Sequence, residues 1–190
     1  MSRDGWGRSK MNKIDAMVSE RQDFERALWV IRESVQNAAE LIAKAFLNGN
    51  KLLICGNGGS AADSQHMAAE FVGRFEKERP GLPAIALTVD SSALTAIGND
   101  WSFDHVFRRQ LEALGRPDDV VLCITTSGNS SNVLEALAHA RINGLRSIGL
   151  VGRDGGKLVA DVIINVGGTR TPIIQERQLA VEHMICELVD

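Results

Sequence analysis

Two side chains suited to acid–base chemistry, His66 and Glu70, stand four residues apart in a segment with helical character. A spacing of four places them about 40° apart on a regular helix, so the imidazole and the carboxylate share one face. Such a pair can move protons near neutral pH or bind a divalent metal such as zinc. The same spacing also occurs as an ordinary contact on a solvated helix, and the pair alone leaves both interpretations open.

A glycine-rich turn, Gly56-Asn57-Gly58-Gly59-Ser60, precedes this helix and follows the apolar run Lys51–Cys55. A buried strand is therefore predicted to end in a turn that opens a helix. Glycines let a ligand approach the backbone, and the free N–H groups of a helix start favour an anion or a polar oxygen. The dinucleotide fingerprint G-x-G-x-x-G is absent. We expect a ligand seated here to meet His66 and Glu70 one to two turns further on.

A second candidate site follows the apolar run Val120–Ile124, where six of the seven residues from Thr125 to Ser131 carry a hydroxyl or an amide. Hydroxyl donors and helix-start N–H groups can satisfy phosphoryl oxygens without a lysine. The nucleotide motif G-K-[ST] is absent. A serine cap of a helix would need only one or two such residues, so the run favours phosphate binding.

Three further positions remain ambiguous from the residues alone. Asn99-Asp100 are either turn residues or contacts for sugar hydroxyls. Gln175 and His183 lie on one stripe of the predicted last helix, Ile173–Val189. A histidine on such an apolar helix is more often a satisfied buried residue than a ligand.

The elements that position these residues alternate along the chain. Strands are predicted at Lys51–Cys55, Ala84–Leu87, Val120–Ile124, Arg146–Val151 and Val162–Val166. Helices are predicted at Ile14–Asn48, after the glycine turn, and at Ser92–Gly98, Phe103–Leu114, Ser131–Ile142 and Ile173–Val189, with a short turn near 156–160. This alternation predicts a three-layer α/β/α sandwich with a five-stranded parallel sheet, preceded by a long N-terminal helical segment.

The N-terminal helical segment carries an apolar stripe that must pack somewhere. The stripe consists of Phe24, Leu28, Ile31, Val35, Ala38, Ile42 and Ala45. It either covers the sheet or pairs with another subunit. We expect residues 1–12 to be disordered and residues 13–190 to form a single domain.

Composition excludes several classes of protein. The 190 residues carry a formal net charge of −3, which argues against a nucleic-acid partner. No apolar run approaches the roughly 20 residues of a membrane span, and the N-terminus lacks an apolar signal core. The three cysteines form no C-x-x-C motif, which favours buried reduced thiols and a cytoplasmic location.

Taken together, the motifs resemble the sugar isomerase (SIS) domain family and, within it, the sedoheptulose 7-phosphate isomerases, or phosphoheptose isomerases. The resemblance covers about residues 13–190. Its motifs are C-G-N-G-G-S-A-A-D-S-Q-H-M-A-A-E, R-P-G-L-P-A-I-A-L, L-T-A-I-G-N-D, T-T-S-G-N-S, G-R-D-G-G-K and I-Q-E…H-M-I-C-E-L.

This resemblance implies a flavodoxin-like sandwich, a homotetramer with active sites at subunit interfaces, and an isomerase that converts D-sedoheptulose 7-phosphate to D-glycero-D-manno-heptose 7-phosphate for lipopolysaccharide or other surface heptose. Glu70 and His183 match the catalytic base and acid. The phosphate loop is matched by Thr125, Thr126, Ser127 and Ser130. The sugar contacts are matched by Asn57, Gly58, Gly59, Ser60, Glu70, Asn99, Asp100 and Gln175. Some members bind zinc, at positions that match His66, Glu70, Gln175 and His183.

The chain departs from the family pattern at three positions. Thr125 stands where serine is common, Ile173 where arginine is usual, and Gln178 where histidine is common. One alternative is a non-catalytic relative that binds the replication initiator protein, but that relative lacks the glutamate that matches Glu70. A second alternative is an isomerase of another sugar phosphate.

Overall fold

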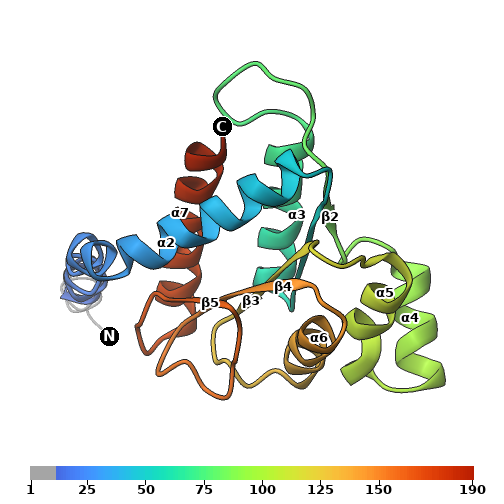
Figure 1. Cartoon of the computed structure of the whole chain (residues 1–190). Coiled ribbons are helices and arrows are strands. Elements are labelled where there is room, and N and C mark those ends of the chain that lie inside the picture. Colours follow the sequence, from blue (N-terminus) through green and yellow to red (C-terminus); the bar gives the residue numbers. More distant parts are fainter. Residues whose placement is uncertain (1–11) are drawn as a thin grey trace.

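The computed structural model describes residues 12–190 (Figure 1). The expected disorder of the N-terminus therefore falls, for residues 1–11, outside the described residues. The strands are β1 (Leu52–Gly56), β2 (Ala84–Ala86), β3 (Val120–Thr125), β4 (Arg146–Val151) and β5 (Val162–Asn165). The helices are α2 (Phe24–Leu47), α3 (Gly59–Val72), α4 (Ser91–Asp100), the short 3-10 helix η1 (Phe103–His105), α5 (Val106–Leu114), α6 (Ser131–Ile142) and α7 (Thr171–Val189).

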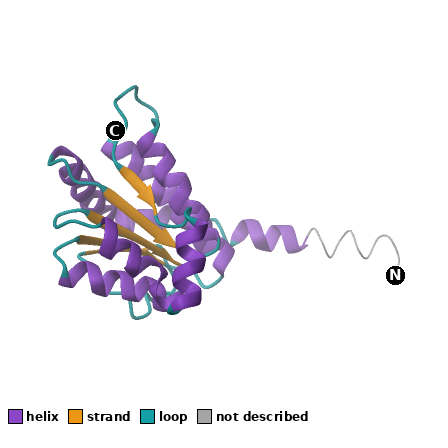
Figure 2. Ribbon diagram, turned by 90° about the vertical axis from the view of Figure 1, so that its right-hand side faces the viewer, coloured by secondary structure: helices purple, strands orange, loops and turns teal. Residues whose placement is uncertain are grey.

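The five strands form one parallel sheet in the order β2-β1-β3-β4-β5. Every residue of the central strands β1 and β3 is buried, as expected for a parallel sheet covered on both faces. Alternate side chains face opposite layers: Leu52 and Ile54 pack toward α2, α3 and α7, whereas Leu53 and Cys55 pack toward α5 and α6. Figure 2 shows the sheet between its helices. The predicted three-layer fold is confirmed.

The long N-terminal helix predicted over Ile14–Asn48 is interrupted. Residues 12–19 are helical and exposed, a turn follows at 20–23, and α2 begins at Phe24. The apolar stripe also begins at Phe24, whereas Ile14, Met17 and Val18 before it are 51%, 39% and 55% exposed and do not join the core. Ion pairs of Glu20 with Arg170 and of Arg21 with Glu176 tie the turn to the start of α7.

The apolar stripe of α2 covers the sheet within the same chain. Ile31, Val35, Ala38, Ile42 and Ala45 are buried in the core on that side of the sheet. On the outward face of α2, Trp29 and Val30 are 72% and 78% exposed. The prediction that the stripe covers the sheet is thus confirmed. The outward face of α2 is exposed to solvent in the single chain.

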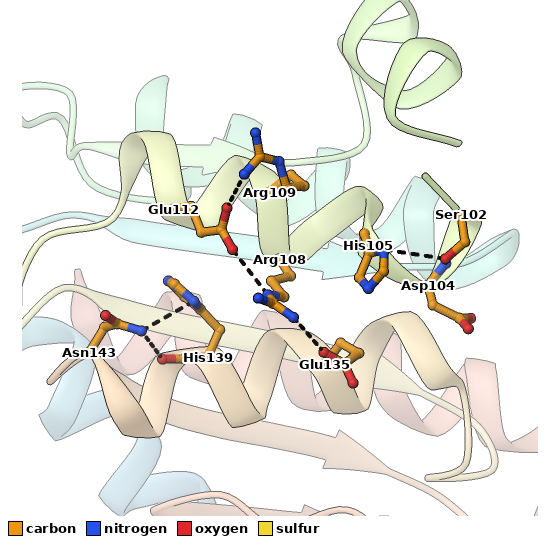
Figure 3. Close-up of polar contacts among 9 residues, drawn as sticks. All are labelled: Ser102, Asp104, His105, Arg108, Arg109, Glu112, Glu135, His139 and Asn143. Carbon is orange, nitrogen blue, oxygen red and sulfur yellow. Dashed lines mark hydrogen bonds and ion pairs between the residues drawn. The ribbon is translucent and has the colours of Figure 1, made fainter. Parts of the chain in front are cut away.

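Polar contacts join α5 and α6 on the far side of the sheet (Figure 3). Arg108 bonds Glu112 on its own helix at 3.0 Å and Glu135 of α6 at 3.3 Å. His139 and Asn143 bond each other on α6. These groups lie on the layer opposite α3 and α7.

Two further observations bear on the class of protein. Across residues 12–190, no helix is both long enough and apolar enough to cross a membrane. All three cysteines are free and buried, with the sulfur atoms of Cys55 and Cys123 3.4 Å apart on neighbouring strands. Burial raises the pKa of the Cys186 thiol to about 12, so this thiol stays protonated and unreactive near neutral pH.

Candidate active site

The carboxyl ends of β1 and β3 bring the two predicted ligand loops together. These neighbouring strands lie where the strand order reverses, which is the usual place for a ligand in an open parallel sheet. The side-chain amides of Asn57 and Asn132 bond each other reciprocally, at 2.8 and 2.9 Å. One loop precedes α3 and the other precedes α6. The Asn57–Asn132 pair therefore fixes the position of one loop relative to the other.

The hydroxyl-rich loop, residues 125–130, packs against the loop that follows β4. The Gly128 backbone has a φ of +66°, and a Cβ there would lie 1.9 Å from the carbonyl oxygen of Gly155. Lys157 N–H donates to the Gly128 carbonyl at 3.0 Å. The G-R-D-G-G-K motif thus supports this loop by close backbone contact that only glycine permits.

Ser130 and Thr125 face each other across this loop, with their hydroxyl oxygens 3.3 Å apart. Ser130 is the N-cap residue of α6, yet its side chain makes no capping bond. Ser127 accepts a bond from the Asn129 N–H, and Thr126 and Ser127 are half-buried. The hydroxyls at 125 and 130 are therefore not consumed by capping, and the helix start with its partial positive charge suits an anion.

The seam between α3 and α7 brings three of the predicted catalytic or metal-ligating residues together. His66 Nε2 and His183 Nε2 are 2.9 Å apart, and Glu70 Oε1 lies 3.6 Å from His66 Nε2. The side chains of His66 and Glu70 are 42% and 24% exposed, so small molecules can reach them. Since two Nε2–H groups cannot face each other, at least one ring presents a lone pair to this point.

The structure places Gln175 elsewhere on the same seam. A Cβ at Gly59 would lie 2.1 Å from Gln175 Nε2, so Gln175 packs directly on the glycine turn. His66 is seven residues further along α3, about 10 Å of helical rise. In a single chain, Gln175 thus lies with the glycine turn and His183 lies with His66 and Glu70. Ser60 is buried in the first turn of α3, and Gly58 forms its N-cap.

The residues Asn99 and Asp100 are not brought to this seam. They end α4, are exposed, and bond each other through their side chains at 2.9 Å. In Figure 1, α4 lies beyond the β2 edge on the side away from α7.

The two departures from the family pattern on α7, Gln178 and Ile173, are both buried side chains. Gln178 is fully buried, and its amide nitrogen donates to the carbonyl oxygens of Thr125 at 3.0 Å and Leu150 at 3.1 Å. It thereby ties α7 to the last residues of β3 and β4. Ile173 is buried at the start of α7, where an arginine would lose its hydration.

Two acidic side chains, the buried Glu182 and the half-buried Asp63, influence each other's charge near His66. Glu182 is fully buried on α7, and within the described residues neither of its carboxylate oxygens has a hydrogen-bond partner. Burial, assisted by the charge of Asp63, raises the pKa of Glu182 to about 8. Burial also raises the pKa of Asp63, against the opposing effect of His66. Glu182 is therefore protonated in the folded protein at neutral pH.

The donor atoms at the seam partly fit a zinc ion. Two imidazole nitrogens and a carboxylate are common zinc ligands, and two such nitrogens on one tetrahedral ion lie roughly 3.3 Å apart. The Nε2 atoms of His66 and His183 are at 2.9 Å, close to that separation. Over residues 12–190, however, no three His, Cys, Asp or Glu side chains are already arranged around one point. The seam supplies two ligands directly, with Glu70 beside them.

Several residues near the site escaped the sequence analysis. Asn132 and Glu182 lie on helices outside the quoted motifs, and Asp63 lies within the glycine-turn motif without a predicted role. The partners of these residues lie on other elements. Phe75, whose ring centroid is 5.6 Å from that of His183, comes from the loop after α3. For the polar residues among them, the one available signal in the sequence was a polar side chain at a helix position where the apolar pattern expects a core residue.

Comparison with known proteins identifies the family. The model of the SIS domain matches residues 21–152. A phosphoheptose isomerase of Geobacter sulfurreducens is 56% identical over 172 residues, covering 90% of this chain and 91% of the relative. One from Aliarcobacter butzleri is 48% identical over 179 residues, covering 93% and 95%.

Solved structures agree with these relatives. A phosphoheptose isomerase from Francisella tularensis superposes with a TM-score of 0.91 at 34% identity, covering 95% of this chain and 98% of the other. One from Neisseria gonorrhoeae superposes with a TM-score of 0.88 at 44% identity, with the same coverage. The chain therefore belongs to the SIS domain family and, within it, to the phosphoheptose isomerases, a family of sugar-phosphate isomerases.

Proposed function

We propose that this chain converts D-sedoheptulose 7-phosphate into D-glycero-D-manno-heptose 7-phosphate, and that the product enters the synthesis of lipopolysaccharide core or another surface heptose. The observation that carries the proposal is the meeting of Glu70, His66 and His183 on a chain that also presents a hydroxyl-rich helix start. The family membership supports the reaction class. The names of the relatives support the seven-carbon substrate.

The proposed chemistry assigns one proton to each of two side chains. Aldose–ketose interconversion passes through an enediol, which requires removal of a carbon-bound proton and transfer of an oxygen-bound one. Glu70 is the base for the first, and His183 shuttles the second, because imidazole changes charge near neutral pH. His66, in contact with His183 and close to Glu70, orients both. Each proton-transfer role is worth roughly 10²–10⁴-fold in rate.

The hydroxyl loop and the seam together suit a long substrate. His66 lies about 10 Å along α3 from the glycine turn, next to which the hydroxyl loop is fixed by the Asn57–Asn132 pair. A ketose with its phosphate at one end and its carbonyl near the other spans such a distance better than a short sugar does.

We extend the proposal to the assembly and the location. A homotetramer with sites at subunit interfaces is supported by the exposed Trp29 and Val30 on α2, and by the position of Asn99 and Asp100 far from the seam of their own chain. Sedimentation of the purified protein should give the mass of four chains, and a monomer would contradict this. The buried free cysteines support a cytoplasmic location.

The function is tested by substrate comparison. Purified protein should form aldose from sedoheptulose 7-phosphate much faster than from fructose 6-phosphate or unphosphorylated sedoheptulose. Ser130→Ala should raise KM for the phosphorylated sugar about 10–100-fold, the effect of one lost hydrogen bond to a charged group. The same variant should leave the slow reaction of unphosphorylated sedoheptulose unchanged, which provides the matched control. Equal efficiency with and without the phosphate would overturn the assignment of the loop.

We also propose that a zinc ion binds at the seam, held by His66, Glu70 and His183. Gln175, the fourth predicted ligand, packs on the glycine turn of its own chain, so a neighbouring subunit would have to supply it. Zinc bound there would polarise a carbonyl and stabilise the charge of an enediolate. Protein purified without chelator should contain about one zinc per chain by elemental analysis, and His66→Ala should reduce that content sharply. Metal-free protein whose activity responds neither to chelator nor to added zinc would refute the site.

A further inference from the structure

The loop between α3 and β2, residues 73–83, is long and has no helix or strand of its own. It arches beside the end of α7 (Figure 1). A carboxylate of α7's end holds it: Asp190 Oδ2 accepts the backbone N–H groups of Glu76 at 3.0 Å and Lys77 at 3.2 Å, and Asp190 Oδ1 accepts Arg79 Nε at 2.6 Å. The Arg79 and Asp190 side chains are only 13% and 1% exposed.

Arg79 uses its remaining N–H groups on the end of α3. Its Nη2 donates to the Glu70 carbonyl at 3.1 Å, and its Nη1 donates to the Phe71 carbonyl at 2.9 Å. The last carbonyls of a helix lack partners within the helix, so this guanidinium caps the turn that carries the Glu70 side chain. The planar fork of arginine can reach a carboxylate and two carbonyls at once, which a lysine cannot.

The same loop also contacts the second catalytic side chain. The ring centroid of Phe75 lies 5.6 Å from that of His183, while the His66 ring lies 5.2 Å from His183. His183 is thus bounded by an aromatic ring of the loop as well as by His66. A shift of the loop would release one of these two neighbours.

Arg79 and Asp190 form a buried ion pair in which the carboxyl of Asp190 stays ionised. Burial would raise the pKa of the Asp190 carboxyl, but the bonds from Arg79, Glu76 and Lys77 outweigh it and hold that pKa below its ordinary value. Removal of one partner leaves the other charge buried without compensation. A second ion pair of this loop, Arg74 with Glu78, is exposed, with side chains 55% and 87% accessible.

We propose that Arg79 and Asp190 are positioning residues: they clasp the loop 73–83 across the ends of α3 and α7, and so hold Glu70 and His183 in register for catalysis. The inference rests on the proposed roles of Glu70 and His183. The two clasp side chains bond each other and backbone groups of the loop and of α3. The clasp acts on the proton-transfer groups and leaves the hydroxyl loop at 125–130 unaffected.

The test uses Arg79→Lys and Asp190→Asn in the full chain, with Glu78→Ala as the matched control in the same loop. Arg79→Lys keeps the charge but loses the caps on Glu70 and Phe71. Asp190→Asn keeps the shape but sets an amide N–H group against donors. Both variants should lower kcat about 10–100-fold, as expected for a displaced catalytic group. KM for the sugar phosphate should stay within about twofold. Glu78→Ala should behave as the wild type.

Histidine ring NMR without substrate separates positioning from loss of fold. The chain has four histidines, and His105 and His139 lie on the opposite layer. In both clasp variants the ring signals of His66 and His183 should shift, while those of His105 and His139 should stay in place. Unchanged signals for His66 and His183 would overturn the clasp. So would shifted signals with an unchanged kcat, and so would general loss of all four signals in the near-isosteric Asp190→Asn. These readouts need no assumption about the substrate, so the clasp can fail or hold independently of the proposed reaction.

Discussion

Glu70→Gln is expected to lower kcat at least about 100-fold on sedoheptulose 7-phosphate while substrate still binds. Glutamine keeps the size and the hydrogen-bonding shape of the side chain but cannot accept a proton from carbon. The loss should therefore match that of a positioned general base, roughly 10²–10⁴-fold. Because the change acts on the transition state, kcat and kcat/KM should fall together. Steady-state assays over a range of substrate concentrations measure both.

The matched control for this prediction is Glu187→Gln on α7, which changes an exposed glutamate in the same way. It should leave turnover unchanged. Turnover of Glu70→Gln close to that of the wild type would remove Glu70 as the base. Zinc content should be measured in the same samples, because Glu70 is also a proposed ligand. A variant that retains its metal and loses turnover identifies the lost function as proton transfer.

Much of the fold and of the two ligand loops could be predicted because their signals are local. The apolar runs that become β1 and β3 are continuous, and the polar residues follow them directly, as Asn57 and Ser130 do. The topology of parallel sheets then brings such strand ends together without further information. The pairing of Asn57 with Asn132 could not be predicted, since asparagine in a first helical turn also suits an ordinary cap.

The contacts that complete the candidate site join residues far apart in the sequence, and no local sequence pattern predicts them. Arg79 and Asp190 are 111 positions apart, and neither differs in setting from the exposed charges beside it in the sequence. The ion pairs of Glu20 and Arg21 beside the break before α2 are long-range in the same way, because they join elements near opposite ends of the chain. Helical periodicity describes one element at a time, and these contacts depend on how two elements are placed.

Glu182 shows most clearly what the sequence alone leaves out, and it has a measurable consequence. Its pKa is raised from 4.5 to about 8 by burial and by Asp63. An unfolded chain releases this proton near pH 4.5, whereas the folded protein keeps it until about pH 8. Stability therefore falls as the pH rises through this window and levels off above it. The shift corresponds to at most roughly 5 kcal/mol at 1.36 kcal/mol per pKa unit.

Glu182→Gln should remove this pH dependence. The buried amide of the variant has an unsatisfied N–H group at every pH, which costs about 1–3 kcal/mol throughout. The informative quantity is therefore how the difference in unfolding free energy between variant and wild type changes with pH. Relative to the wild type, the free energy of unfolding of the variant should rise by several kcal/mol between pH 5 and pH 9. Urea unfolding at pH 5, 7 and 9 in the presence of chelator measures it. Glu187→Gln, exposed on the same helix, should follow the wild type at each pH. Parallel pH profiles for the wild type and Glu182→Gln would show that Glu182 is not held protonated in the folded chain.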